Sequence, residues 1–334
     1  PALQREADSV FGELSLDVAK DFALVGVGQD ARFTFTASVG DSFALDLAGV
    51  APTPHPQNFG MSIHRPNGTL LTSATASPPL YGAQVQLGAI STAGTYAVTI
   101  DPAYGAHGTA RLTLKQGPLL ATSDPPSAFA TSVTGETQRF RFQAAAGQNL
   151  SLGLTGLAYL GTSSGYATLT VYKPDGTWLN YAYCYPTSIE GRCKMMLANV
   201  PVAGTYSIGI QPPAGVRLVG NISLSADQTG TLTENAPVSL SVTRPGQNVR
   251  YTFAGTAGQS TAIELAQLSP SPAGPYVYLW VLKPDGTSLT SASATGNGLL
   301  VNLASLPVTG NYAVLIYANF GIGFSGRLML DPGV

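Results

Sequence analysis

The chain contains an internal repeat, because five short landmarks occur three times in the same order along its 334 residues. The first landmark is an Arg followed by alternating aromatic residues; it starts at Arg32, Arg139 and Arg250, at spacings of 107 and 111 residues. The others are a Gly at 40, 147 and 258, a Pro-Asn/Asp-Gly segment at 66–68, 174–176 and 284–286, a Gly-x-Tyr segment at 94–96, 204–206 and 310–312, and a closing segment at 110–114, 221–224 and 327–330. A period of this length suits self-contained domains, because solenoid units have only roughly 20–50 residues. We therefore predict three homologous domains.

Each copy has the residue pattern of short β-strands. Charged residues make up 10% of the chain, against roughly 25% in an average globular protein, which is too few for the exposed faces of many helices. Segments such as 43–47 alternate in the manner of a strand with one buried face. We predict about eight strands per copy, and in the first copy these are 23–27, 32–36, 43–47, 61–64, 70–75, 83–87, 95–100 and 110–114.

The predicted fold is all-β, with three tandem homologous antiparallel β-sandwich domains that are jelly-roll-like or immunoglobulin-like. The predicted domains are residues 1–117, which include an N-terminal extension at 1–20, then 118–228 and 229–334. The connecting segments near 116–126 and 226–237 are too short for long flexible tethers, so a semi-rigid string of domains is expected. The recurring arginines are expected to be structural, with their stems packed along an edge strand.

The two cysteines bear on the cellular compartment. Cys184 and Cys193 lie nine residues apart, with Pro186 and Gly191 between them, which suits a disulfide that closes a short loop. Two buried free thiols are the alternative. We favour the disulfide, and with it an oxidising, secreted context.

The sequence offers no pattern for catalysis, a metal or a cofactor. The segment 161–165 matches G-x-S-x-G, but no His follows His107, and a Ser nucleophile of that kind needs one later in the chain. The segment 321–326 matches G-x-G-x-x-G without the helix that a dinucleotide site requires. The three His residues have no zinc spacing. A net charge of −2 gives no footprint for nucleic acid, and no run of 18 apolar residues predicts membrane insertion.

Two segments of the third copy carry a family resemblance. Lys-Pro-Asp-Gly-Thr at 283–287 and Leu-Pro-Val-Thr-Gly-Asn-Tyr at 306–312, followed by a Gly-led closing strand, resemble the pre-peptidase C-terminal-like sandwich modules of bacterial secreted proteins. Similar tandem copies accompany RHS/YD repeats in large surface proteins. The resemblance implies a non-catalytic accessory region of a longer polypeptide. Collagen-binding relatives bind calcium through clustered acids, and this chain has no such cluster.

Aromatic residues that do not recur between copies are the candidate site. In the third copy, Leu279 and Val281 are expected to point inward, so Tyr276, Tyr278 and Trp280 occupy the opposite face. They form either an exposed patch that suits sugar rings or a surface that a neighbouring domain covers.

The second copy has its own aromatic cluster beside the cysteines, formed by Trp178, Tyr181, Tyr183 and Tyr185. The corresponding residues of the third copy are Ser and Thr, so the fold does not require the aromatic rings. The three tyrosines share the parity of Leu179, which is expected to point inward unless a bulge intervenes. A binding surface and a cap on the domain's own core are therefore both open.

These patterns favour a structural and interaction protein over an enzyme. The first hypothesis is a rigid spacer and adhesion module within a larger secreted or cell-surface bacterial protein, with a glycan or protein ligand possible. The alternative is a carbohydrate-binding module that uses the Tyr and Trp residues of the second and third copies. No cofactor is expected.

Overall fold

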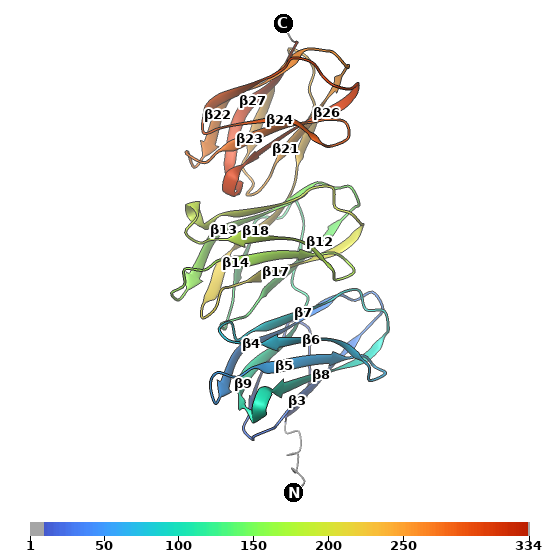
Figure 1. Ribbon diagram of the computed structural model, residues 1–334, viewed down its shortest axis with the longest axis vertical. Coiled ribbons are helices and arrows are strands. Elements are labelled where there is room, and N and C mark those ends of the chain that lie inside the picture. Colours follow the sequence, from blue (N-terminus) through green and yellow to red (C-terminus); the bar gives the residue numbers. More distant parts are fainter. Residues whose placement is uncertain (1–9, 333–334) are drawn as a thin grey trace.

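The computed structural model describes residues 10–332, which form three β-sandwiches stacked along one long axis, with the two ends of the chain at opposite ends of the stack (Figure 1). These residues contain 27 strands and three single-turn 3-10 helices. The all-β fold of three tandem sandwiches is thereby confirmed. Within the same residues, no helix is long and apolar enough to cross a membrane.

Sandwich 1 comprises a five-stranded sheet in the order β1-β3-β8-β5-β6 and a four-stranded sheet in the order β2-β9-β4-β7. Its strands are β1 (Val10–Glu13), β2 (Ala19–Leu24), β3 (Ala31–Ala37), β4 (Phe43–Thr53), β5 (Phe59–His64), β6 (Leu70–Ala76), β7 (Ala83–Leu87), β8 (Gly94–Pro102) and β9 (His107–Lys115). The helix η1 (Ala103–Gly105) lies between β8 and β9.

Sandwiches 2 and 3 repeat this topology, with sheets β10-β12-β17-β14-β15 and β11-β18-β13-β16, then β19-β21-β26-β23-β24 and β20-β27-β22-β25. Sandwich 2 has β10 (Leu119–Leu120), β11 (Ser127–Ala130), β12 (Gln138–Ala144), β13 (Leu150–Leu160), β14 (Ala167–Tyr172), β15 (Trp178–Cys184), η2 (Ile189–Gly191), β16 (Cys193–Leu197), β17 (Gly204–Gln211) and β18 (Arg217–Ala226). Sandwich 3 has β19 (Gln228–Thr231), β20 (Val238–Val242), β21 (Val249–Gly255), β22 (Thr261–Ser271), β23 (Val277–Leu282), β24 (Ser288–Ala294), β25 (Asn297–Leu303), β26 (Gly310–Ala318), η3 (Asn319–Gly321) and β27 (Gly323–Pro332).

Each described sandwich has nine strands, one more than the sequence predicted. The additional strand is β1, β10 or β19, which pairs in parallel with the strand that carries the recurring Arg. Part of the predicted extension at 1–20 therefore belongs to sandwich 1, whereas residues 1–9 lie outside the described residues. The strand predicted at 23–27 is wrong in its position: β2 ends at Leu24, because the side chain of Gln29 accepts the N–H groups of Val25 and Gly26 and forms a turn.

The recurring landmarks contact one another inside each sandwich. The buried Tyr96 stacks on Phe35 with ring centroids 5.2 Å apart, and its hydroxyl donates to the carbonyl of Thr92 over 2.8 Å. The same stacking joins Phe142 to Tyr206 and Phe253 to Tyr312. The glycine two residues before each of these tyrosines has a φ of 139 to 156°. A Cβ there would lie 2.7 to 2.9 Å from the Pro of the Pro-Asn/Asp-Gly turn. The repeated motifs are thus packing contacts of the fold.

One extra residue recurs in the second strand of three hairpins. Ile63 pairs with Thr72 and His64 with Leu70, which leaves Leu71 as a β-bulge. Leu179 and Leu289 occupy the same bulge in the other sandwiches. All three leucines are partly buried against the core of their own sandwich. The bulge shifts the inward and outward parity of every residue that follows it in the strand.

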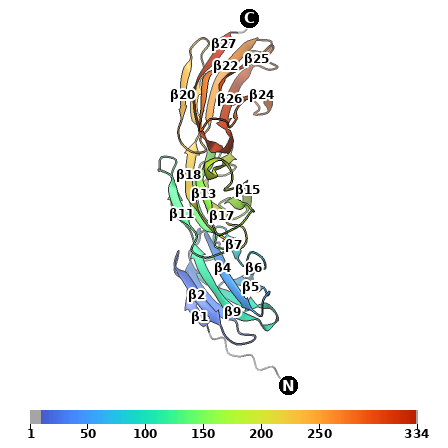
Figure 2. The same cartoon turned by 90° about the vertical axis from the view of Figure 1, so that its left-hand side faces the viewer.

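Successive sandwiches have similar orientations: in Figure 2, β2, β11 and β20 lie along one side of the stack and β6, β15 and β24 along the other. The four-stranded sheet of one sandwich faces the five-stranded sheet of the next. At junction 1/2, the contact between sandwiches 1 and 2, Arg139 on β12 donates to the Gln84 and Gln86 side chains on β7. At junction 2/3, Asn248 beside β21 donates to Ser151 on β13 over 2.8 Å.

The connections between sandwiches are short. Three residues, 116–118, separate β9 from β10, and Asp227 alone separates β18 from β19. The predicted division of the chain at 117/118 and 228/229 stays a prediction. The prediction that the recurring arginines lie on edge strands is wrong, because β3, β12 and β21 each lie inside their sheet. The side chain of Arg139 is in addition buried at a junction.

Candidate ligand-binding surface

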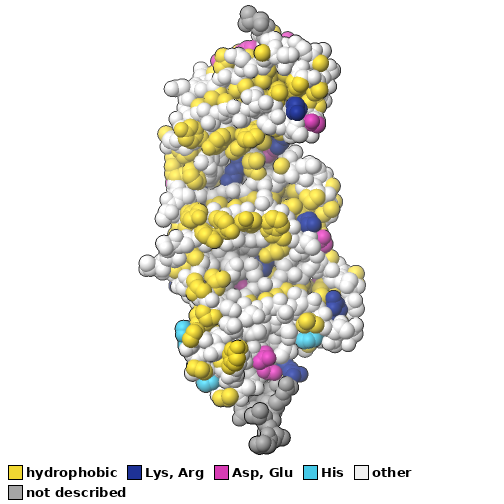
Figure 3. All heavy atoms as spheres, viewed as in Figure 1, with side chains coloured by type: hydrophobic (Ala, Val, Ile, Leu, Met, Phe, Trp, Pro, Cys, Tyr) yellow, Lys and Arg dark blue, Asp and Glu magenta, His cyan; other side chains and the backbone are white. Residues whose placement is uncertain are grey.

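Five aromatic side chains form one exposed row on sandwich 2, which we call the aromatic row. Each is 40 to 55% exposed. Figure 3 shows a band of hydrophobic side chains across the middle sandwich on this side of the molecule. The row consists of the predicted residues Trp178, Tyr181, Tyr183 and Tyr185 together with Tyr166.

The bulge at Leu179 decides which way the row faces. Val171 pairs with Asn180 and Tyr172 with Trp178, so Leu179 is the unpaired residue. Leu179 and Ala182 pack against the core, and the tyrosines after the bulge point outward. The sequence left both orientations open, and the structure resolves them in favour of the surface.

The rings of the aromatic row contact one another in series. The ring centroids of Trp178 and Tyr181 are 5.7 Å apart, those of Tyr181 and Tyr183 are 5.2 Å apart, and Tyr166 lies 4.2 Å from Tyr183 and 5.7 Å from Tyr185. The neighbouring Tyr181 raises the pKa of Tyr183, because two phenolate charges so close would repel. The row is a continuous apolar strip with hydroxyl groups on most of its rings.

Tyr166 was missed by the sequence analysis because it lies in the loop before β14, outside any alternating pattern. Because the adjacent Ala167 pairs with Cys184, Tyr166 lies beside Tyr183 and Tyr185, the two neighbours of that cysteine. The loop is held by Tyr159, whose hydroxyl donates to the carbonyl of Gly165 over 2.8 Å. Burial raises the pKa of Tyr159 to about 12. The G-x-S-x-G match at 161–165 lies in this loop, which follows β13 and precedes another strand.

The predicted disulfide between Cys184 and Cys193 is present, and both cysteines are buried. It joins β15, at the edge of the five-stranded sheet, to β16, at the edge of the four-stranded sheet. The bond therefore connects the two layers of sandwich 2 immediately beside the aromatic row. A structural disulfide fits an extracellular protein.

The predicted stripe on sandwich 3 is only partly exposed. Tyr276 is 50% exposed, whereas Tyr278 and Trp280 are half-buried. Tyr278 stacks on Tyr317 with ring centroids 5.1 Å apart, and Lys194 of sandwich 2 places its Nζ 4.8 Å from the Tyr317 ring. The exposed-patch interpretation is therefore wrong for most of the stripe, because this sheet faces sandwich 2. A role of these residues in ligand binding stays a prediction.

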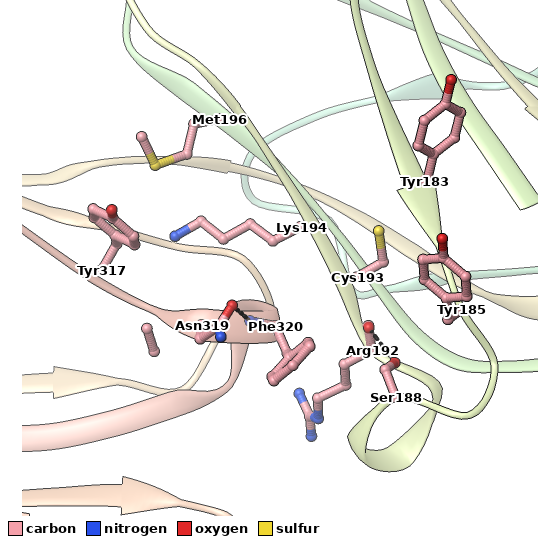
Figure 4. A pocket seen from close by; sticks show the side chains of 11 residues that line it. Tyr183, Tyr185, Ser188, Arg192, Cys193, Lys194, Met196, Tyr317, Asn319 and Phe320 are labelled. Atoms are coloured by element: carbon pink, nitrogen blue, oxygen red, sulfur yellow. Dashed lines mark hydrogen bonds between the residues drawn. The ribbon is translucent and has the colours of Figure 1, made fainter. Parts of the chain in front are cut away.

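A cavity of about 320 Å³ lies between sandwiches 2 and 3, at the lower end of the size range of small-molecule sites. In Figure 4, Tyr183 and Tyr185 line it from one side, and Tyr317, Asn319 and Phe320 from the other. Ser188 and Arg192 complete its rim. The sequence analysis did not single out the residues of η3, because no local pattern shows that η3 faces β16.

The described part of the chain contains no group of three or more His, Cys, Asp or Glu side chains that could hold a metal ion. The G-x-G-x-x-G match at 321–326 runs from the end of η3 into β27, and no α-helix follows it among the described residues. His55 lies beside Tyr81, with Nε2 2.7 Å from the hydroxyl.

No protein-family model matches the chain, and no curated protein matches it. Among solved structures, the pre-peptidase C-terminal domain of Bacillus anthracis collagenase is similar at 18% identity and a TM-score of 0.26, over 31% of this chain and 96% of that chain. The lysozyme inhibitor PliG of Aeromonas hydrophila is similar at 17% identity and a TM-score of 0.23, over 32% and 100%. The tandem CBM22 domains of Xyn10C from Paenibacillus barcinonensis are similar at 9% identity and a TM-score of 0.21, over 58% and 82%.

With TM-scores this low, these similarities carry no argument about activity. A pre-peptidase C-terminal domain is among the structures similar to part of the chain, as the resemblance in sequence anticipated, whereas the association with RHS/YD repeats stays a prediction.

Proposed function

We propose that the chain is a non-catalytic, rigid segment of a larger secreted or cell-surface bacterial protein, where it acts as a spacer and an adhesion or interaction module. The observation that carries this proposal is the burial of polar and charged side chains at both junctions. Such side chains are expensive to bury unless their partners stay in place, so they favour one fixed arrangement of the sandwiches.

Junction 1/2 contains a buried network of charges. The Nζ of Lys115 lies 3.2 Å from Asp46 within sandwich 1 and 2.8 Å from Glu136 of sandwich 2. Asp46 also accepts the N–H of Thr137 over 3.1 Å. Burial raises the pKa of Asp46 although the nearby Lys115 acts to lower it. Separation of the sandwiches would break the Lys115–Glu136 ion pair and the Thr137–Asp46 hydrogen bond, both of which cross junction 1/2.

Junction 2/3 also contains buried polar side chains with partners in both sandwiches, but the residue types differ from those of junction 1/2. The side-chain amide of the buried Asn248 donates to Ser151 over 2.8 Å and to Asp227 over 2.9 Å, and it accepts from Lys194. Ser223 of sandwich 2 donates to the carbonyl of Pro245 over 3.0 Å. Both junctions therefore combine side-chain and backbone hydrogen bonds between sheets.

Small-angle X-ray scattering tests the rigidity. We expect the wild-type chain to scatter as a single rod, and Arg139→Ala to increase flexibility between sandwiches 1 and 2, since it removes the bonds to Gln84 and Gln86. Arg32→Ala is the matched control, because Arg32 holds the equivalent position on sandwich 1 and lies at neither junction. A wild-type chain that already scatters as freely jointed sandwiches contradicts the proposal.

A second candidate function, carbohydrate binding, is favoured by the exposed aromatic row. Sugar rings present C–H faces that stack on aromatic rings, and hydroxyls that bond to phenol groups. Tyrosine-rich surfaces also bind with little loss of conformational entropy, because their side chains have two rotatable angles. The rings on β15 are not required by the fold, since β6 carries Leu, Ser and Thr and β24 carries Ser at the equivalent outward positions.

Binding of oligosaccharides, measured by calorimetry, tests this second function. Trp178→Ala is expected to weaken binding about tenfold, which corresponds to roughly 1.4 kcal/mol. Leu70→Ala is the control, because Leu70 occupies the equivalent position of sandwich 1 and has nearly the same exposure, 54% against 55%. Equal affinities of the wild type and Trp178→Ala would exclude the aromatic row as the binding surface.

A further inference from the structure

The two aromatic groups that the sequence shows as separate features meet at one cavity. Tyr183 and Tyr185 belong to the aromatic row of sandwich 2, and Tyr317 stacks on Tyr278 of the sandwich 3 stripe. Tyr183, Tyr185 and Tyr317 line the cavity at junction 2/3 (Figure 4). An exposed strip of rings therefore leads from Trp178 along β15 into a recess that sandwich 3 closes.

The part of the recess contributed by sandwich 3 is the turn η3. Phe320 has a left-handed φ of 56°, and the side-chain oxygen of Asn319 accepts its N–H over 3.0 Å. The Phe320 side chain is 38% exposed although it lies between two sandwiches. An apolar ring kept accessible in this way, beside the amide of Asn319, offers both stacking and hydrogen bonding to a ligand.

The recess carries little net charge for a ligand to neutralise. The guanidinium of Arg192 lies 2.7 Å from the carboxylate of Glu190. Lys194 points from β16 towards Tyr317 and donates to Asn248, and burial lowers its pKa to about 7. The groups at the rim are therefore aromatic rings, hydroxyls, an amide and a paired guanidinium, which suit a neutral ligand rich in hydroxyl groups.

We propose that the aromatic row and the recess form a single elongated site for a neutral oligosaccharide, one end of which is held between sandwiches 2 and 3. This inference rests on the carbohydrate-binding function proposed above. A chain that lies along β15 contacts sandwich 2 alone, whereas its terminal unit in the recess also contacts Phe320 and Asn319. The ligand thereby bridges the junction, and affinity rises with chain length until the recess is filled.

The test is calorimetric titration with neutral oligosaccharides of two, four and six units from the cello, xylo and malto series. We expect at least one hexasaccharide to bind, and both Trp178→Ala and Phe320→Ala to weaken it about tenfold. Phe320→Tyr is expected to retain binding, which separates loss of the ring from disturbance of the turn. Leu70→Ala is expected to bind as the wild type does, and thermal unfolding of each variant checks its folding.

The outcomes separate the two proposals. If Phe320→Ala binds the hexasaccharide as tightly as the wild type while Trp178→Ala does not, the aromatic row binds alone and the composite site is overturned. If no sugar of the three series binds, both proposals fail. Tighter binding of an acidic oligosaccharide, such as oligogalacturonate, overturns the neutral ligand class.

Discussion

The charge of Lys194 depends on the stacking of sandwiches 2 and 3, because sandwich 3 supplies some of its neighbours. Its ammonium lies 4.8 Å from the Tyr317 ring and donates to Asn248. Burial lowers its pKa to about 7, although the carboxylate of Asp227 acts in the opposite direction. Nothing adjacent to Lys194 in sequence predicts this position, because its partners lie more than thirty residues away.

The lowered pKa of Lys194 makes the stability of junction 2/3 dependent on pH. Between about pH 7 and 10 the folded chain has released this proton and the unfolded chain still binds it, so the free energy of unfolding rises with pH. Below pH 7 both states are protonated and the slope disappears. We expect the unfolding temperature, measured by calorimetry, to rise over this range in the wild type more than in Lys194→Met.

Lys173→Met is the control for this measurement, because Lys173 lies in the turn after β14 near Asp175 rather than at junction 2/3. An identical pH slope in the wild type and Lys194→Met would show that Lys194 does not titrate in this range.

At the scale of strands, the disulfide links the two sheets of sandwich 2 at an edge where no strand pairing joins them. β15 and β16 are edge strands of different sheets, and Cys184 and Cys193 are joined across them. Sandwiches 1 and 3 contain no cysteine, so their equivalent edges have no such bond. The bond therefore stabilises the strand that carries the aromatic row.

Removal of the disulfide is expected to destabilise sandwich 2 by about 2–3 kcal/mol, the range for a short closed loop. The double variant Cys184→Ser/Cys193→Ser should unfold at a lower denaturant concentration, as followed by tyrosine and tryptophan fluorescence. Reductant should lower the wild-type midpoint in the same way and leave that of the variant unchanged. Coincident midpoints for the wild type and the double variant would contradict this expectation.

Most strands could be predicted because the sequence alternates where one face is buried, and Ala83–Leu87 is predicted to the residue. The strands that escaped prediction, such as β10 (Leu119–Leu120), are too short to show a period. Their structure comes from pairing with a distant strand. The orientation of the aromatic row depended on a bulge at Leu179, which is visible only in the register of β14 and β15.

At the scale of the whole molecule, close backbone approach fixes the spacing of the sandwiches. A Cβ on Gly88 of sandwich 1 would lie 1.9 Å from the carbonyl oxygen of Asp175 in sandwich 2. The adjacent Ala89 donates its N–H to the carbonyl of Pro174 over 3.1 Å. The short linkers predicted a semi-rigid string, but the face-to-face contact itself could not be inferred, because its residues follow no local pattern.

Gly88→Ala is expected to force sandwiches 1 and 2 apart, since a methyl group at that distance overlaps backbone atoms. We expect calorimetry to resolve separate unfolding transitions in the variant where the wild type unfolds in fewer, coupled ones. Gly296→Ala is the control, because the nearest atom to its Cβ would lie 3.8 Å away. A variant with the same transitions as the wild type would mean that the junction contributes little to stability.

The stacking of a four-stranded face on a five-stranded face also gives the rod a direction. If two like faces packed together, the contact would cover both of them and could not be extended. Contact between unlike faces instead leaves a five-stranded face at one end of the three sandwiches and a four-stranded face at the other. Sandwich 1 accordingly exposes Val25, Val27 and Tyr104 beyond 70% in its β2–β3 loop and η1, whereas the η3 turn of sandwich 3 lines the recess at junction 2/3. The same surface is therefore exposed in sandwich 1 and lines a junction in sandwich 3, where its side chains must also fit the neighbouring sandwich.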